Sequence, residues 1–139
     1  MIYEKIPDSH FKTAVERRVI MCDPEKHPFF EKYRDKESCV ESYILTEKVA
    51  PLQKNFYFIN NGMTPNEDYL WFLCAFPPAN YMVLGVVSLD AQKPFIKCFP
   101  NAQFTCESPM VSHDGKGVYY AGKREIYYIE PTGNIKKIG

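Results

Sequence analysis

Two stretches of sequence, Met63–Phe72 (MTPNEDYLWF) and Met110–Tyr120 (MVSHDGKGVYY), decide the fold class of this 139-residue chain. Each stretch combines the end of one strand, a polar turn and an apolar strand. Their first methionines lie about 47 residues apart, a spacing typical of architectures in which each repeat is one supersecondary unit. One such unit cannot bury both of its faces, so the repetition predicts units that pack on one another.

Around each stretch the pattern of apolar runs and turn residues predicts four strands in the same order. The first set is expected at 55–60, 69–76, 81–89 and 95–99, with a loop at 51–54. The second set is expected at 108–111, entered from 103–106, and then at 118–121, 126–129 and 135–138. The sets differ mainly between their second and third strands, where 76–81 forms a longer loop than 122–124. Four ordered strands that recur in this way favour β-propeller blades over a single hairpin of a β-sandwich.

Composition narrows the class of protein. Seventeen acidic residues balance seventeen basic ones, so charge favours neither nucleic acid nor an anionic membrane as a partner. Ten Tyr and ten Phe favour strands, and eleven Pro argue against a helix bundle. No apolar run has the length of a membrane span, and the N-terminus lacks the order of a signal peptide.

The N-terminal region, 1–38, differs from the rest and is expected to be a helical or irregular extension. A helix is predicted at 11–20 with its cap at Asp8 or Ser9, and a second, short one at 28–34 with Pro28 at its first position. The propeller-type part is expected at 39–139. It is divided into an outer strand at 39–50, a first blade at 51–100 and a second blade at 101–139.

The second set resembles the repeat of TolB-like β-propellers, which reads roughly S-P-x-W-S-P-D-G-K, an apolar strand, then I-Y-x-x-D-x-x-G. Residues 108–116, 118–120 and 126–133 carry this likeness. The first set is similar to the N-terminal region of the oligogalacturonate lyase group, through Ile44-Leu45-Thr46 and then Phe56–Pro65. The Asp-Gly of that pattern is replaced here by Asn66-Glu67.

The resemblance implies the N-terminal portion of a β-propeller that binds or β-eliminates acidic oligosaccharides in its full-length form. It implies no complete active site and no cofactor in this chain, with a divalent metal such as Mn bound by later blades. Two blades cannot close a ring, so the remaining blades or another copy of the chain are expected at the open edges. The alternatives are a non-enzymatic binding scaffold and a small β domain that oligomerises through those edges.

Candidate ligand-binding residues lie in loops that would share one rim of a propeller. Arg124, next to Lys123, is suited to holding a uronate carboxylate with two parallel hydrogen bonds. The other candidates come from the corresponding loops: Gln53, Lys54, Asn80, Tyr81 and Gln103. Each has a plainer interpretation as a solvated loop residue. Trp71 and at least one tyrosine of each Tyr-Tyr pair are expected in the core.

Neither the cysteines nor the histidines form a readable metal motif. The five cysteines are odd in number and contain no CxxC pair, which favours reduced thiols acting as small core residues in a cytoplasmic setting. His10, His27 and His113 are expected at the surface. No pair of carboxylates can be assigned as an acid and base.

Overall fold

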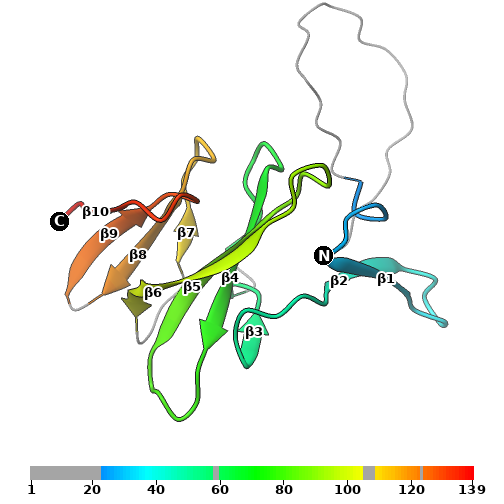
Figure 1. Ribbon diagram of the computed structural model, residues 1–139, viewed down its shortest axis with the longest axis horizontal. Helices are drawn as coiled ribbons and strands as arrows, with labels where there is room; N and C mark the ends of the chain where they lie inside the picture. The colour runs from blue at the N-terminus through cyan, green and yellow to red at the C-terminus, as the bar shows by residue number, and fades with distance from the viewer. Residues whose placement is uncertain (1–22, 58–59, 105–108, 123) are drawn as a thin grey trace, which may run out of the picture.

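The computed structural model describes residues 23–57, 60–104, 109–122 and 124–139, and these form ten β-strands (Figure 1). No helix occurs in these four ranges. The helix predicted at 11–20 lies outside the described residues. The short helix predicted at 28–34 is wrong, because Phe30–Arg34 forms strand β1. A segment this short forms a helix only with support from packing, and here strand pairing and the partly buried Phe29 and Phe30 supply other interactions.

The N-terminal hairpin consists of β1 and β2 (Glu41–Leu45), paired antiparallel from Phe30 opposite Leu45 to Arg34 opposite Glu41. Its turn is closed by Asp35, whose Oδ1 accepts hydrogen bonds from the backbone N–H of Glu37 and Ser38. Strand β2 confirms that a strand lies within the range predicted for the outer strand, 39–50. Its partner is β1, a segment that the sequence pattern assigned to the extension.

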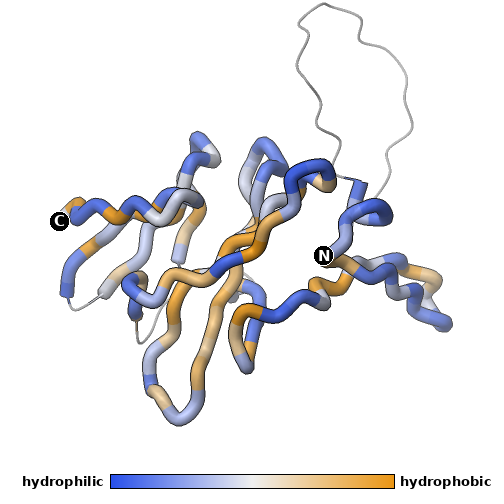
Figure 2. Tube along the Cα trace, in the orientation of Figure 1, coloured by the Kyte–Doolittle hydropathy of each residue, from blue (hydrophilic) through white to orange (hydrophobic). Residues whose placement is uncertain are grey.

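The first sheet contains β3 (Leu52–Lys54), β4 (Tyr69–Ala75), β5 (Met82–Ser88) and β6 (Ile96–Phe104), in that order. Strands β4 and β5 confirm the predictions at 69–76 and 81–89. They are predominantly apolar (Figure 2) and almost entirely buried, as expected for strands covered on both faces. Gly85 lies opposite Phe72, and a Cβ at this position would run into the Phe72 ring.

The edge of the first sheet next to β4 is formed by two separate segments of the chain. Leu52–Lys54 pairs with the C-terminal half of β4, and Met63 forms a separate bridge with Leu70 near its start. Residues 55–57 are not part of the sheet, and Phe56 is buried in the core. Further along, the side-chain amide of Asn60 donates to Pro109 O at 3.1 Å. The predictions for this segment were therefore wrong: 51–54 is largely strand, and 55–57 is not. Residues 58–59 of the predicted strand lie outside the described residues.

The second sheet contains β7 (Met110–Val111), β8 (Val118–Gly122), β9 (Glu125–Ile129) and β10 (Ile135–Lys137), each paired antiparallel with its chain neighbour. The two four-stranded sheets therefore have the same consecutive order, as the sequence predicts. Strand β6 is longer than predicted. It continues through Pro100 to Phe104 across an irregularity in its register with β5.

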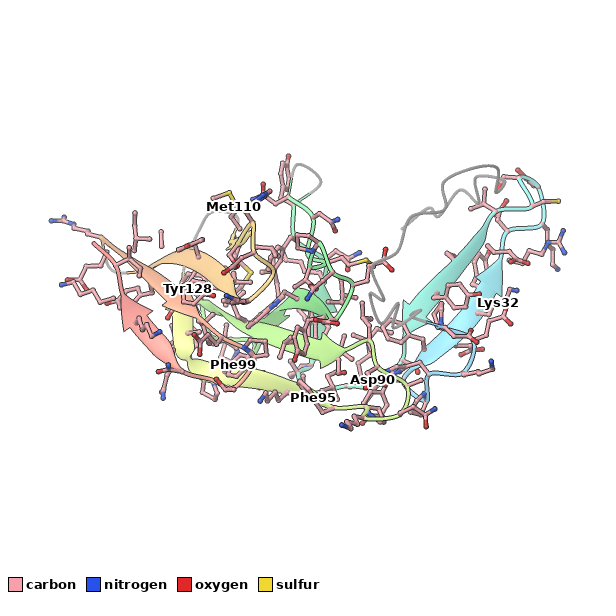
Figure 3. The ribbon with its side chains drawn as sticks, turned by 90° about the horizontal axis from the view of Figure 1, so that it is seen from above. Lys32, Asp90, Phe95, Phe99, Met110 and Tyr128 are labelled. Atoms are coloured by element: carbon pink, nitrogen blue, oxygen red, sulfur yellow. The ribbon has the colours of Figure 1, made fainter. Side chains whose placement is uncertain are left out.

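Two apolar cores cover the two faces of the first sheet. One core lies between the sheets and includes Trp71, Leu84 and Phe99 of the first sheet with Val118 and Ile129 of the second. Figure 3 shows Phe99 on β6 at the side of the second sheet. The other core contains Leu70, Phe72, Cys74, Val83 and Val87, covered by Phe29, Phe30, Leu45, Val49 and Ala50. The first sheet is thus the central layer, between the second sheet and the N-terminal segment (Figure 1).

Residues can be matched between the sheets row by row, because both share the same pairing. The row Trp71, Val86, Lys97 corresponds to the row Tyr119, Tyr128, Lys136. The row Leu70, Val87, Ile96 corresponds to Val118, Ile129, Ile135. The matched residues of β4 and β8 are 48 positions apart, one more than the spacing of the two methionines.

Candidate functional site

Most of the candidate binding residues lie at the end of the sheets where β4 leads into β5 and β8 leads into β9. Gln53 and Gln103 belong to one row across the first sheet, Gln53–Cys74–Val83–Gln103. Their backbones are three strand spacings apart, or about 14 Å, so only an extended ligand would reach both. The second sheet adjoins this end, because a Cβ on Gly122 would lie 2.8 Å from the carbonyl oxygen of Gln103.

Two of the predicted loop residues are strand residues whose side chains hold the local backbone. Gln53 lies in β3, and its Oε1 accepts from the N–H of Val49 at 2.6 Å and of Ala50 at 3.2 Å. Gln103 lies in β6, and its Nε2 donates to Pro100 O at 3.0 Å. The assignment of both to loops was wrong. Their hydrogen bonds stabilise a bend and a bulge, so ligand binding would have to compete with them.

The cations of this end are exposed. Lys54 ends β3, and Arg124 occupies the tight turn between β8 and β9 with φ of 71°. Within the described ranges, neither has a carboxylate within ion-pair distance. Asn80 is exposed, and Tyr81 packs against the core between the first sheet and the N-terminal segment. Lys123 lies outside the described residues. Lys54 and Arg124 are therefore the side chains best placed to meet an anionic ligand.

A groove of about 730 Å³ lies between Met63 and strand β7. It is beside the turns that precede β4 and β8, at the end of the sheets opposite to Lys54 and Arg124. Met63, Met110 and Tyr119 form its apolar lining, and Asn61, Thr64, Ser112 and His113 contribute polar groups. None of these residues was singled out from sequence as a ligand contact. The usable signal was the repetition itself, because the two matched turns, 64–69 and 112–117, form the two sides of this groove.

The two histidines in the described ranges, His27 and His113, lie in different surroundings. His27, predicted at the surface, is buried with 3% exposed. Its Nδ1 accepts from the N–H of Phe29 at 3.2 Å, so Nε2 carries the proton and donates to Ser88 O at 2.8 Å. Burial lowers the pKa of His27, partly offset by the Ser88 carbonyl and Asp90. His113 is exposed as predicted, and His10 lies outside the described residues.

The described cysteines are free thiols in different surroundings. Cys74 is fully buried, Cys98 is half-buried and Cys39 is exposed, so the prediction of core cysteines holds for Cys74 and is wrong for Cys39. Burial, with a smaller contribution from Cys98, raises the pKa of Cys74 to about 12. Cys22 and Cys106 lie outside the described residues.

Within the ranges that the structure describes, no three His, Cys, Asp or Glu side chains are grouped as a metal site would require. The same ranges contain no helix with the length and apolar character needed to cross a membrane. Comparison of the chain with protein-family models, with curated proteins and with solved structures finds no match.

Proposed function

We propose that this chain is the N-terminal portion of a β-propeller protein that binds or β-eliminates acidic oligosaccharides in its full-length form. The observation that carries the proposal is the row-by-row match of two four-stranded antiparallel sheets. Stacked units of this kind are what a propeller requires. The likeness to oligogalacturonate lyases supplies the ligand class.

The exposed cations at one end of the sheets support an acidic ligand. Arg124 offers a planar guanidinium that can bind a carboxylate through two parallel hydrogen bonds, and Lys54 adds a second positive charge at the same end. A uronate oligomer carries one carboxylate on each sugar ring and is extended. It would fit a rim on which binding groups come from different strands.

This chain is not expected to catalyse β-elimination by itself. The described residues contain no group of three His, Cys, Asp or Glu side chains that could hold a metal ion, and a divalent metal such as Mn would be held by residues outside this chain. The expected contribution of these two units is to orient the substrate through its carboxylates. The chemistry would depend on the remaining units.

Binding is tested by titrating the isotopically labelled chain with an oligogalacturonate and following backbone NMR shifts. Shifts are expected at Lys54 and at the β8–β9 turn, and a neutral galactose oligomer of the same length should cause none. Arg124→Gln should weaken binding about tenfold, as expected for a charge-assisted bond, while Arg124→Lys should be intermediate. Equal shifts with the neutral oligomer would refute an acidic ligand.

A non-enzymatic scaffold is the second candidate, and the side-chain bonds of Gln53 and Gln103 favour it. Two of the candidate rim residues serve the backbone of their own segments. Turnover of oligogalacturonate by the full-length protein, followed by the ultraviolet absorbance of the unsaturated product, separates the two candidates. Binding without turnover, with and without Mn²⁺, would support the scaffold.

A further inference from the structure

The face of the second sheet that points away from the first sheet is largely apolar, and the described residues leave it partly exposed. It carries Met110, Tyr119 and Ala121 of β7 and β8 together with Ile126 and Tyr128 of β9. Lys136 also lies on this face, in the row of Tyr119 and Tyr128. Met110 is 57% exposed, Ile126 is 50% exposed and Tyr119 is 37% exposed. Beyond β9 the face continues to Ile138, whose backbone N–H donates to Ile126 O at 2.7 Å. We call this surface the outer face.

The outer face corresponds to a surface of the first sheet that is already buried. Tyr119, Ile126 and Tyr128 match Trp71, Leu84 and Val86, and Ile138 matches Phe99. All four residues of the first sheet belong to the core between the sheets. The residues that cover them from the second sheet include Val118, Tyr120 and Ile129.

The match identifies the occupant. We propose that a third four-stranded unit of the same repeat packs on the outer face, presenting an apolar set equivalent to Val118, Tyr120 and Ile129. The contact would repeat the existing one between the two sheets. This inference rests on the proposed propeller architecture but not on the acidic ligand.

A second copy of the chain fits this face less well. Among the described residues, the required apolar set occurs on two surfaces. One is the face of the second sheet that packs on the first sheet, and the other is the matching face of the first sheet, with Leu70, Phe72 and Val87. The first of these surfaces is buried against the first sheet, and the second is covered by the N-terminal segment. A copy would have to expose one of its own cores before it could dock in this way.

The proposal is tested with a tandem chain in which a copy of residues 101–139 follows Gly139. The tandem starts at 101 because Ile138, near the end of the chain, matches Phe99. Hydrogen exchange of β8 and β9 of the original second sheet, resolved by mass spectrometry or NMR, is expected to slow about tenfold or more. The matched control is a tandem chain whose added copy carries Val118→Ser and Tyr120→Ser, and it should exchange like the original chain.

A second variant keeps the test decisive if the control copy fails to fold. Ile126→Lys in the original second sheet should leave the unfolding midpoint of the unextended chain unchanged, because this side chain is half exposed. In the tandem chain it should abolish the added protection. Equal protection in the tandem chains with and without Ile126→Lys would overturn the proposal.

Sedimentation of the unextended chain addresses the alternative occupant. A monomer supports docking of a third unit, whereas a dimer that Ile126→Lys dissociates assigns the face to a second copy and overturns the proposal. Oligogalacturonate titration of the tandem chain distinguishes the two proposals. Slower hydrogen exchange of β8 and β9 without oligogalacturonate binding contradicts only the proposed ligand. Oligogalacturonate binding without slower exchange contradicts only the proposed third unit.

Discussion

The hydroxyl of Thr64 and the hydroxyl of Ser112 occupy the same position in two matched turns. Thr64 Oγ1 accepts from the N–H of Tyr69 at 3.0 Å, and Ser112 Oγ accepts from the N–H of Gly117 at 3.1 Å, five residues further along in both cases. Each turn also contains a residue with positive φ at the same place, Glu67 at 58° and Gly115 at 71°. The two turns are therefore one structural element built from different residues.

Removal of either hydroxyl should destabilise the protein, and Thr64→Ala should cost more than Ser112→Ala. Thr64 is 1% exposed and also accepts from the N–H of Asp68, so its loss leaves two backbone donors without their partner. We expect a loss of about 1–3 kcal/mol in the free energy of unfolding for Thr64→Ala, measured in urea. Thr64→Ser keeps the hydroxyl and should retain most of the stability. Equal losses for Thr64→Ser and Thr64→Ala would show that the methyl group, not the hydroxyl, stabilises the turn.

Trp71, the single tryptophan, should tolerate phenylalanine far better than alanine. Its side chain is fully buried, and its Nε1 has no hydrogen-bond partner among the described residues. Phenylalanine removes this unpaired donor, which offsets part of the lost packing, and we expect a net cost below about 2 kcal/mol. Trp71→Ala should cost about 3–5 kcal/mol because it leaves a cavity between the sheets. Thermal unfolding followed by circular dichroism measures both, and a Phe variant as unstable as the Ala variant would contradict this account.

His27 should make stability fall as the solution becomes mildly acidic. Its folded-state pKa is lowered, so the unfolded chain binds more protons, and stability decreases as pH falls through the ordinary value of about 6.5 until the folded-state pKa is reached. Protonation would also place an N–H on Nδ1 facing the N–H of Phe29. Urea unfolding between pH 7.5 and 5 should show this slope. His27→Gln should remove it, whereas the exposed His113→Gln should leave it in place; an identical slope in His27→Gln would exclude His27 as the cause.

Thiol reagents should distinguish Cys39 from Cys74. Cys39 is exposed, whereas Cys74 is fully buried with its pKa raised to about 12, so almost none of it is thiolate at neutral pH. Peptide mapping after brief iodoacetamide treatment at pH 7.5 should find modification at Cys39 and little at Cys74. The same treatment in urea should modify both. Rapid modification of Cys74 in the native protein would show that the core between the first sheet and the N-terminal segment opens readily.

The strands that sequence predicted well are those with long apolar runs. Residues of β4 and β5 are buried on both faces, so nearly every position carries an apolar side chain and the pattern does not depend on a partner. Strand β1 was missed because four of its five residues are exposed and its strand state comes from pairing with β2. The strand predicted at 55–60 was wrong because its aromatic residues are typical of a strand, whereas Phe56 is buried in the core between the sheets without pairing in either sheet.

The candidate site was predicted only in part. Its location at one end of the sheets follows from chain order, since antiparallel neighbours return their connections to alternate ends. Two features could not be predicted from the spacing of residues in the sequence, because they depend on distances in space. These are the hydrogen bonds of Gln53 and Gln103 to backbone groups and the groove between the two matched turns. The burial of His27 likewise depends on Ser88, which lies 61 residues away in sequence.

The sequence by itself determined the repeat of apolar strands and polar turns, because neighbouring strands of a sheet must bury their apolar side chains on a shared face. Only the tertiary structure decided which faces are covered. The matched residues Trp71 and Tyr119 are both aromatic, yet Trp71 is fully buried and Tyr119 is 37% exposed. Burial is a property of what packs against a face, and the second sheet covers Trp71 whereas no described residue of this chain covers the outer face around Tyr119.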